Sequence, residues 1–258
     1  MKSRWIALVA LLVAVVFVTA ALAELSAFDI AKKSLELDRT KTKTSTYQLT
    51  VINKRGKKKE YKFKVWEKQY ADGAKKLIRF VEPADASGTG LLNHEKKGAD
   101  DLQWLFLPSL NKARRLAGGD RDGEFMGSDL FYEDMSTQSA EDFNHTLISQ
   151  VMYNNKQCYL IESVPKPDVN SAYSKMRSWV DIETFVGYKI ELYDKKNKLL
   201  KTVTSKKIEQ IDGIWTTREA VVVTVKKGKA KTILKLLERE YNVDIPDNTF
   251  TKQFLERY

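Results

Sequence analysis

Hydrophobic and polar residues alternate along most of the chain after residue 46, a pattern typical of half-buried β-strands. Tyr47, Leu49 and Val51 alternate with polar neighbours. The run Lys54-Arg55-Gly56-Lys57 then supplies a turn, and the alternation resumes at Tyr61, so these segments predict a β-hairpin. Further strands are expected over residues 77–81, 102–107, 112–116, 146–152, 157–164, 175–181, 187–193, 199–211, 215–226 and 232–241.

Two segments break this alternation. Residues 26–39 place apolar side chains at a loose helical spacing, with Ser26 suited to the N-cap and Asp29 three residues later. Residues 118–139 are rich in glycine, aspartate and aromatic residues and have no strand periodicity. We expect a loop there, with a short helix around residues 128–135.

The expected fold class is mainly β with a few helices. So many short strands at fairly even spacing favour a single large antiparallel sheet. Residues 232–241 are long enough for a helix, but the hairpin signal before them favours a strand, and a short helix is expected from Thr249. Because twist accumulates across a wide sheet, we expect it to curl into an unclosed β-barrel covered by short helices. No linker or repeat divides residues 24–258, which predicts one domain.

The N-terminus has the layout of a secretory signal peptide. Lys2 and Arg4 precede an apolar run over residues 5–18, and Ala21-Leu22-Ala23 supplies the small residues of a cleavage site. A retained membrane anchor is the alternative, but the apolar run is shorter than the roughly 20 residues needed to span a bilayer. We therefore expect residues 1–23 to be a signal peptide that is cleaved after Ala23, and the protein to be exported.

Composition adds one open question and one expectation. The formal net charge is +10, which fits contact with anionic lipid headgroups. Lysines that protect the edges and outer face of a sheet would give the same surplus. Cys158 is the only cysteine, so no internal disulfide is possible, and its apolar neighbours favour a buried, inert thiol.

No pattern predicts a catalytic, metal or cofactor site. The two histidines, His94 and His145, lie far apart in the sequence, and there is no G-x-S-x-G motif. Residues 120–124 loosely resemble a calcium loop, but they lack the full spacing and contain an arginine, so a solvated turn is favoured. Export and the absence of an aromatic-plus-basic motif disfavour nucleic-acid binding. We expect a protein that is not an enzyme.

Large apolar residues gather where the concave face of a curled sheet is expected. Residues 102–107 are largely apolar on both faces, with Trp104 and Phe106 on the same one. Residues 125–132 are dense in large apolar side chains without strand periodicity, which favours a mobile flap over a cavity, although ordinary core packing is the alternative for each aromatic residue. The predicted cavity and lid residues are Phe80, Trp104, Phe106, Phe125, Met126, Leu130, Phe131, Tyr132, Trp179 and Trp215.

Five short motifs follow one another along the middle of the chain. They are Phe80-Val81-Glu82-Pro83, Gly88-Thr89-Gly90-Leu91-Leu92, Trp104-Leu105-Phe106-Leu107-Pro108, Arg114-Arg115-Leu116 and the run from Phe125 to Asp134. In this order they resemble the outer-membrane lipoprotein-sorting (LolA-like) family. The resemblance covers roughly residues 30–258 and is sharpest over residues 80–135.

The resemblance implies a periplasmic protein whose unclosed β-barrel encloses an apolar cavity beneath helices. It implies a carrier or binder of lipid or lipoprotein acyl chains that moves cargo toward the outer membrane. The partners implied are the membrane surface, contacted transiently, and an inner-membrane exporter of the resistance-nodulation-division (RND) type; no cofactor or nucleic acid is implied. On chemistry alone, Arg79, Arg114 and Arg115 are candidates for an arginine that gates the cavity or binds a headgroup.

Two other hypotheses compete with a carrier. The first is a non-carrier interaction module of the cell envelope, such as an exporter accessory or a stress sensor, in which the concave face is packed shut. The second is an enzyme that acts on lipid or glycan, for which convergent carboxylates with shifted pKa values would be needed. The volume of the cavity distinguishes the carrier from the packed module.

Overall fold

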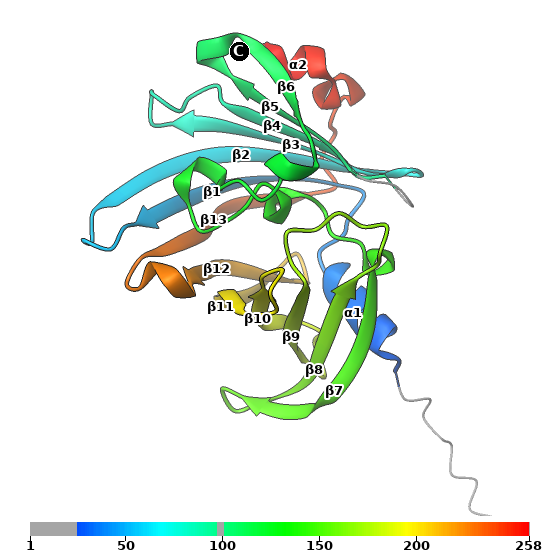
Figure 1. The fold of residues 1–258 in the computed structure, drawn as a ribbon. Coiled ribbons are helices and arrows are strands. Elements are labelled where there is room, and N and C mark those ends of the chain that lie inside the picture. Colours follow the sequence, from blue (N-terminus) through cyan, green and yellow to red (C-terminus); the bar gives the residue numbers. More distant parts are fainter. Residues whose placement is uncertain (1–24, 97–100, 258) are drawn as a thin grey trace, which may run out of the picture.

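The computed structural model describes residues 25–96 and 101–257. Within them, one antiparallel sheet of 13 strands curls into an unclosed half-barrel (Figure 1), which confirms the expected fold class. The first six strands are β1 (Thr42–Ile52), β2 (Lys58–Tyr70), β3 (Gly73–Glu82), β4 (Gly90–His94), β5 (Leu102–Leu107) and β6 (Lys112–Leu116). The others are β7 (Phe143–Tyr153), β8 (Lys156–Pro165), β9 (Lys175–Asp181), β10 (Gly187–Tyr193), β11 (Leu199–Ile211), β12 (Ile214–Thr224) and β13 (Lys231–Tyr241).

The last strand joins the two halves of the sheet. Strands β6 to β1 follow one another in space, β13 then pairs with β1, and the order continues from β12 down to β7. Residues 232–241 therefore form a strand, as predicted. Strands β6 and β7 are the two edges of the sheet, so the barrel does not close. Strand β4 is the one that the sequence did not predict, because both of its faces are buried and its residues do not alternate.

Helix α1 (Ala27–Leu35) lies on the concave side of the sheet, against β7, β8 and β9 (Figure 1). It begins as predicted: the Ser26 hydroxyl accepts a hydrogen bond from the Asp29 backbone N–H, and the Asp29 carboxylate accepts one in return from the Ser26 backbone. The helix ends at Leu35, earlier than expected, and the chain continues as a turn that places Asp38 above the sheet.

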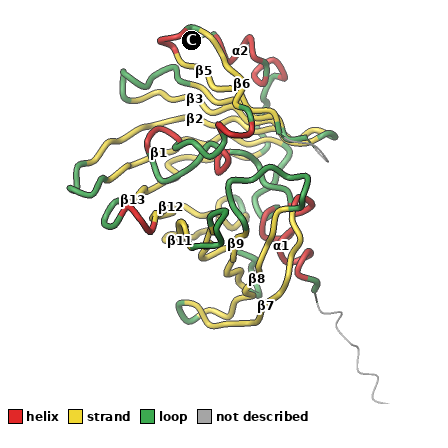
Figure 2. Tube along the Cα trace, in the orientation of Figure 1, coloured by secondary structure: helices red, strands yellow, loops and turns green. Residues whose placement is uncertain are grey.

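A second cover lies on the other face. Helix α2 (Lys252–Glu256) and the 3-10 turn before it, Asp247–Phe250, pack on the convex side of strands β3 to β6 (Figure 1). Residues 118–139 instead cross the concave side as a loop with short 3-10 turns (Figures 1 and 2). The helix expected near residues 128–135 is one such turn, Glu133–Met135.

Consecutive residues of β3 to β5 enter two different cores. Ile78 and Leu105 belong to a concave cluster with Phe125, which comes from the loop. Their neighbours Leu77 and Phe106 belong to a convex cluster with residues of the C-terminal turn and helix. The sheet is therefore buried on both faces in this half. The convex cluster consists of Leu77, Leu92, Phe106, Ala113, Ile245, Phe250 and Leu255.

The N-terminal prediction lies outside this description. The signal peptide expected over residues 1–23, with its cleavage site after Ala23, falls outside the described residues. Among the described residues, none of the helices combines the length and the hydrophobicity that a bilayer crossing requires.

Candidate functional site

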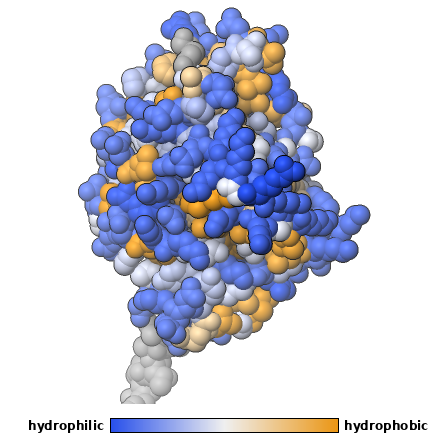
Figure 3. All heavy atoms as spheres, turned by 90° about the vertical axis from the view of Figure 1, so that its left-hand side faces the viewer, coloured by the Kyte–Doolittle hydropathy of each residue, from blue (hydrophilic) through white to orange (hydrophobic). Residues whose placement is uncertain are grey.

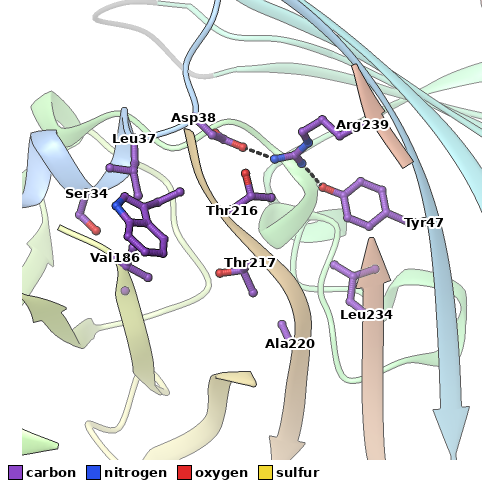
Figure 4. Close-up of a pocket in the computed structure, with 12 residues that line it drawn as sticks. Ser34, Leu37, Asp38, Tyr47, Val186, Thr216, Thr217, Ala220, Leu234 and Arg239 are labelled. Carbon is purple, nitrogen blue, oxygen red and sulfur yellow. Dashed lines mark hydrogen bonds and ion pairs between the residues drawn. The ribbon is translucent and has the colours of Figure 1, made fainter. Parts of the chain in front are cut away.

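Three neighbouring cavities lie on the concave face of the sheet. The central cavity, about 270 Å³, lies between the end of α1, strand β1 and strands β12 and β13 (Figure 4). The charged cavity, about 250 Å³, lies over β1, β2 and β3 below Asp134 and Met135. The α1 cavity, about 60 Å³, lies beneath α1. Shared lining residues connect them in a row: Asp38, Tyr47, Leu234 and Arg239 border the first two, and Ser34 and Gly187 border the central and α1 cavities.

The central cavity is amphipathic. Asp38, Arg239 and Tyr47 form a polar side, and Leu37 and Val186 lie across from them (Figure 4). The rest of the lining mixes apolar and hydroxyl side chains, namely Trp215, Ala220, Leu234, Ser34, Thr216 and Thr217.

Arg239 is the centre of the polar side. Its guanidinium lies 2.6 Å from an Asp38 carboxylate oxygen and donates hydrogen bonds to the hydroxyls of Tyr47 and Ser45. Asp38 follows α1 in the chain, so this pair links the end of the helix to the sheet. Burial acts to raise the pKa of Asp38, but Lys43 and Arg239 outweigh it and hold that pKa below its usual value.

The ion pairs continue into the charged cavity. Lys43 Nζ lies 3.0 Å from an Asp38 carboxylate oxygen and 3.4 Å from Glu67 Oε1. Lys76 Nζ lies 3.6 Å from Glu67 Oε2. Burial acts to raise the pKa of Glu67, yet these two lysines lower it below the usual value of a glutamate. The site therefore holds the buried Glu67 carboxylate and several half-buried charges of both signs in mutual contact.

The α1 cavity is the apolar end of the row. Its wall comes from one face of α1 and from the concave side of strands β7 to β10. The apolar residues that line it are Ala31, Leu35, Phe143, Ile161, Met176, Val180 and Ile190.

Five of the predicted cavity and lid residues pack in or against the concave cluster. Phe80, Phe125 and Leu130 are buried there, and Met126 and Tyr132 are half-buried against it. The Phe125 ring centroid lies 5.5 Å from that of Phe80 and 5.7 Å from that of Tyr132. This part of the concave face is therefore filled by the chain itself. The role of these residues in ligand binding stays a prediction.

Trp104 and Phe106 lie on the opposite face from Phe125. Phe106 is buried in the convex cluster, and Trp104 packs against that cluster. The expectation that both line the concavity together with the Phe125 segment is wrong, because alternation separates two faces without saying which one is concave. Leu105 lies on the concave face instead.

The remaining predicted aromatic residues are dispersed. Trp215 lines the central cavity. Trp179 alternates with Ser178 and Val180, which line the α1 cavity, so it faces the convex side, where Lys189 Nζ lies 4.4 Å from its ring. Phe131 stacks on Tyr173 with the ring centroids 5.9 Å apart.

Two of the three predicted arginines have structural partners in the fold. Arg79 is buried on the convex side and donates hydrogen bonds to the backbone carbonyls of Gly88 (2.6 Å) and Leu255 (2.7 Å), which holds α2 on the sheet. Arg114 is exposed and pairs with Asp120, and Arg115 is exposed. None of these three lines the central, charged or α1 cavity, whereas Arg239, which the sequence did not single out, lines two of them.

A strand irregularity explains why Arg239 was missed. Strand β13 directs every second side chain, those of Thr232, Leu234 and Leu236, toward one face. Unbroken alternation would place Arg239 on the other face. The pairing of β1 with β13 shifts between Thr46 and Tyr47, where one extra residue of β13 is inserted. This bulge reverses the facing of the strand, so that Arg239 enters the cavity.

Both histidines and the single cysteine have structural partners. His94 bonds to the Phe250 carbonyl and His145 to Ser163, and burial lowers the pKa of each ring. Burial raises the pKa of the Cys158 thiol to about 11. Over residues 25–96 and 101–257, no three His, Cys, Asp or Glu side chains are grouped in a way that could hold a metal ion.

An unclosed antiparallel half-barrel with cavities beneath a helical cover is also the fold of a LolA superfamily protein. A family model described as that of an uncharacterized protein matches residues 72–257, so the chain belongs to that family, and its solved structural neighbours include proteins assigned to outer membrane lipoprotein sorting and to the LolA superfamily, in agreement with the resemblance seen in the sequence. No curated protein matches the chain significantly.

Solved structures from three bacteria share the fold over their whole length. A DUF1329 family protein from Desulfovibrio piger is 28% identical, with 89% of this chain and 97% of that chain covered and a TM-score of 0.84. A domain from Vibrio parahaemolyticus assigned to outer membrane lipoprotein sorting is also 28% identical, with coverages of 89% and 98% and a TM-score of 0.83. A LolA superfamily protein from Nitrosomonas europaea, 20% identical with coverages of 90% and 100%, shows the same fold with a TM-score of 0.75.

Proposed function

We propose that this protein is a periplasmic carrier of lipid or lipoprotein acyl chains that moves hydrophobic cargo toward the outer membrane, with an RND-type exporter as a candidate partner. The observation that carries the proposal is the amphipathic central cavity, which continues into the apolar α1 cavity. The signal-peptide pattern of residues 1–23 supports export. The similarity to a domain assigned to outer membrane lipoprotein sorting supports the direction of transport.

The energetics suit a carrier that needs no nucleotide. Burial of one methylene group contributes about 0.8 kcal/mol, so a chain of about a dozen carbons contributes on the order of 10 kcal/mol. A cavity that supplies most of this energy lets the chain leave a membrane and return to one at modest net cost. At about 270 Å³, the central cavity lies near the lower limit of ligand pockets, roughly 300 Å³, which suits one chain better than several.

The surface is consistent with brief contact at a membrane. Lys57 ends the exposed turn between β1 and β2, and the exposed Lys58 and Lys59 begin β2, on a side of the molecule that is largely hydrophilic (Figure 3). Each lysine near an anionic bilayer contributes about 1 kcal/mol of attraction. Such a turn holds the protein near headgroups without inserting it.

Native mass spectrometry of protein purified from the cell envelope without detergent tests the proposal. We expect lipid adducts on the wild type and their loss in Ala220→Phe, which fills the central cavity. Ala117→Phe adds the same ring at an exposed position and is the matched control. A wild-type protein that carries no lipid and is not stabilised by added acyl chains would refute the proposal.

A non-carrier interaction module is the second candidate. The observation that favours it is the packing of Phe125 and Leu130 into the concave cluster, which closes that part of the half-barrel. In that case crosslinking in the cell would capture a protein partner, and filling the central cavity with Ala220→Phe would leave the crosslink unchanged.

A further inference from the structure

We infer that the cargo is an anionic amphiphile whose carboxylate or phosphate headgroup binds inside the half-barrel, between Arg239 and Lys43, with its chain in the central and α1 cavities. This inference rests on the proposed function and adds the chemistry of the ligand. Three features of the cavities support it: their polarity, their charge and their size.

The first feature is a gradient of polarity along one row of cavities. Six charged side chains line the charged cavity, and of these only Asp38 and Arg239 also line the central cavity. The α1 cavity, next in the row, is lined mainly by apolar side chains. A ligand that is charged at one end and apolar along its length matches this order, and it places its charge at the shared wall of the charged and central cavities.

The second feature is the balance of charge at that wall. Lys43, Lys76 and Arg239 supply three cations, while Asp38 and Glu67 supply two carboxylates. Asp134, which also lines the cavity, is matched by its own partner Lys201, 2.9 Å away. One positive charge is therefore left over in a half-buried site. Because an unpaired charge that is partly shielded from water is costly, an anion between Arg239 and Lys43 completes the site, whereas a cationic headgroup would worsen the imbalance.

The geometry allows one anion to reach both cations. Arg239 and Lys43 already share the carboxylate of Asp38, at 2.6 Å and 3.0 Å from its two oxygens. The two cations thus lie within reach of a single group that has two oxygens. Asp38 lies in the segment after α1 and not in the sheet. A carboxylate or phosphate of the ligand could therefore bind the same two cations while the strands keep their positions.

The third feature is size. The central cavity measures about 270 Å³ and the α1 cavity about 60 Å³. These volumes accommodate part of one chain better than several chains side by side. A single-chain anionic amphiphile therefore fits better than a neutral or zwitterionic lipid with two chains.

Calorimetric titration of the delipidated full-length mature protein with four probes tests this inference. The probes are dodecanoate, dodecyl phosphate, dodecanol and inorganic phosphate. We expect both anionic amphiphiles to bind about tenfold or more tightly than dodecanol, because charge-assisted hydrogen bonds form only with them. Inorganic phosphate should not bind measurably, because it lacks the chain that supplies most of the binding energy.

Each other outcome has a distinct meaning. Equal binding of dodecanol and dodecanoate overturns the anionic headgroup and leaves the carrier function standing. Binding of inorganic phosphate as tight as that of dodecyl phosphate overturns the amphiphile in favour of a free-anion site. Absence of binding by every probe overturns this inference, and adducts in native mass spectrometry would then show independently whether the carrier function survives.

Variants locate the headgroup. We expect Arg239→Gln and Lys76→Gln each to weaken dodecanoate binding by several-fold up to tenfold while leaving dodecanol binding unchanged. Lys64→Gln removes an exposed lysine on the neighbouring strand and should change neither. Lys76→Gln removes the surplus positive charge of the site and keeps the test decisive if Arg239→Gln does not fold, since Lys76 has a long ion pair of 3.6 Å with Glu67 and a hydrogen bond of 3.5 Å to the Met135 carbonyl. Unchanged dodecanoate binding in Lys76→Gln would overturn the charge surplus as the reason for anion binding.

Discussion

Replacing Phe125 by alanine distinguishes a packed loop from a mobile flap over the cavity. The Phe125 side chain is 1% exposed and packs against the rings of Phe63, Phe80 and Tyr132. A buried phenylalanine removes at least about 150 Å² from water, worth about 4 kcal/mol at 25 cal/mol per Å². Measured losses for Phe→Ala in protein cores, about 3–5 kcal/mol, agree with this figure.

We therefore expect Phe125→Ala to lower the free energy of unfolding by about 3–5 kcal/mol in urea denaturation followed by tryptophan fluorescence. Phe254→Ala is the matched control, because the Phe254 side chain is 36% exposed and should cost less than about 2 kcal/mol. A loss below about 1 kcal/mol for Phe125→Ala would refute the reasoning. It would mean that the loop is only loosely held and can act as the flap that the sequence suggested.

Three further predictions follow from named contacts. Arg239→Gln leaves the half-buried Asp38 carboxylate without its closest cation and should destabilise the protein by about 1–3 kcal/mol in thermal unfolding. The double variant Asp38→Asn, Arg239→Gln should recover part of the loss, and additive losses of the two single variants would contradict the pairing. Burial raises the pKa of Asp101 to about 6, so its ionisation opposes folding. The folded protein is more stable below pH 4, where Asp101 is protonated, and this gain in stability is lost as the pH rises to about 6. Asp101→Asn should thus stabilise the protein by about 1–2 kcal/mol at pH 7 and by little at pH 4, whereas equal melting-temperature shifts at both pH values would contradict this. Ser26→Ala removes the N-cap of α1 and should cost about 1 kcal/mol, with no change in unfolding if the cap is not formed in solution.

The strands could be predicted wherever one face of the sheet meets water. Antiparallel strands of this kind alternate clearly, and β10, β11 and β13 follow the predicted ranges closely. Strands β1 and β2 extend beyond residues 47–51 and 61–65, over which the alternation was recognised. Strand β4 was missed because Leu91 and Leu92 are buried on opposite faces of the sheet. Polar and apolar residues do not alternate along a strand whose two faces are both covered, so the sequence pattern does not reveal such a strand.

The cavity residues were harder to predict, for two reasons. Trp104 and Phe106 were assigned to the concave face although the pattern says only that Leu105 lies on the opposite face from both. Arg239 was missed because the bulge opposite Thr46 and Tyr47 reverses the facing of β13 partway along its length. Both errors concern which face a side chain occupies, and this depends on the curl and register of the sheet rather than on local sequence.

The two covers of the concave face differ in how firmly they are held. Residues 118–139 are fixed by Lys201, which is fully buried and donates hydrogen bonds of 2.9 Å to the Asp129 carbonyl and to the Asp134 carboxylate. Lifting this loop would separate a buried ion pair, at a cost of several kcal/mol. Helix α1 has only Ile30 and Ala31 buried, and its ion pair with the rest of the chain, Lys32 with Glu141, is exposed. Since exposed pairs contribute about 0–1 kcal/mol, displacing the body of α1 from the α1 cavity costs less than lifting the loop, while the segment after the helix stays tied to the sheet through Asp38 and Arg239.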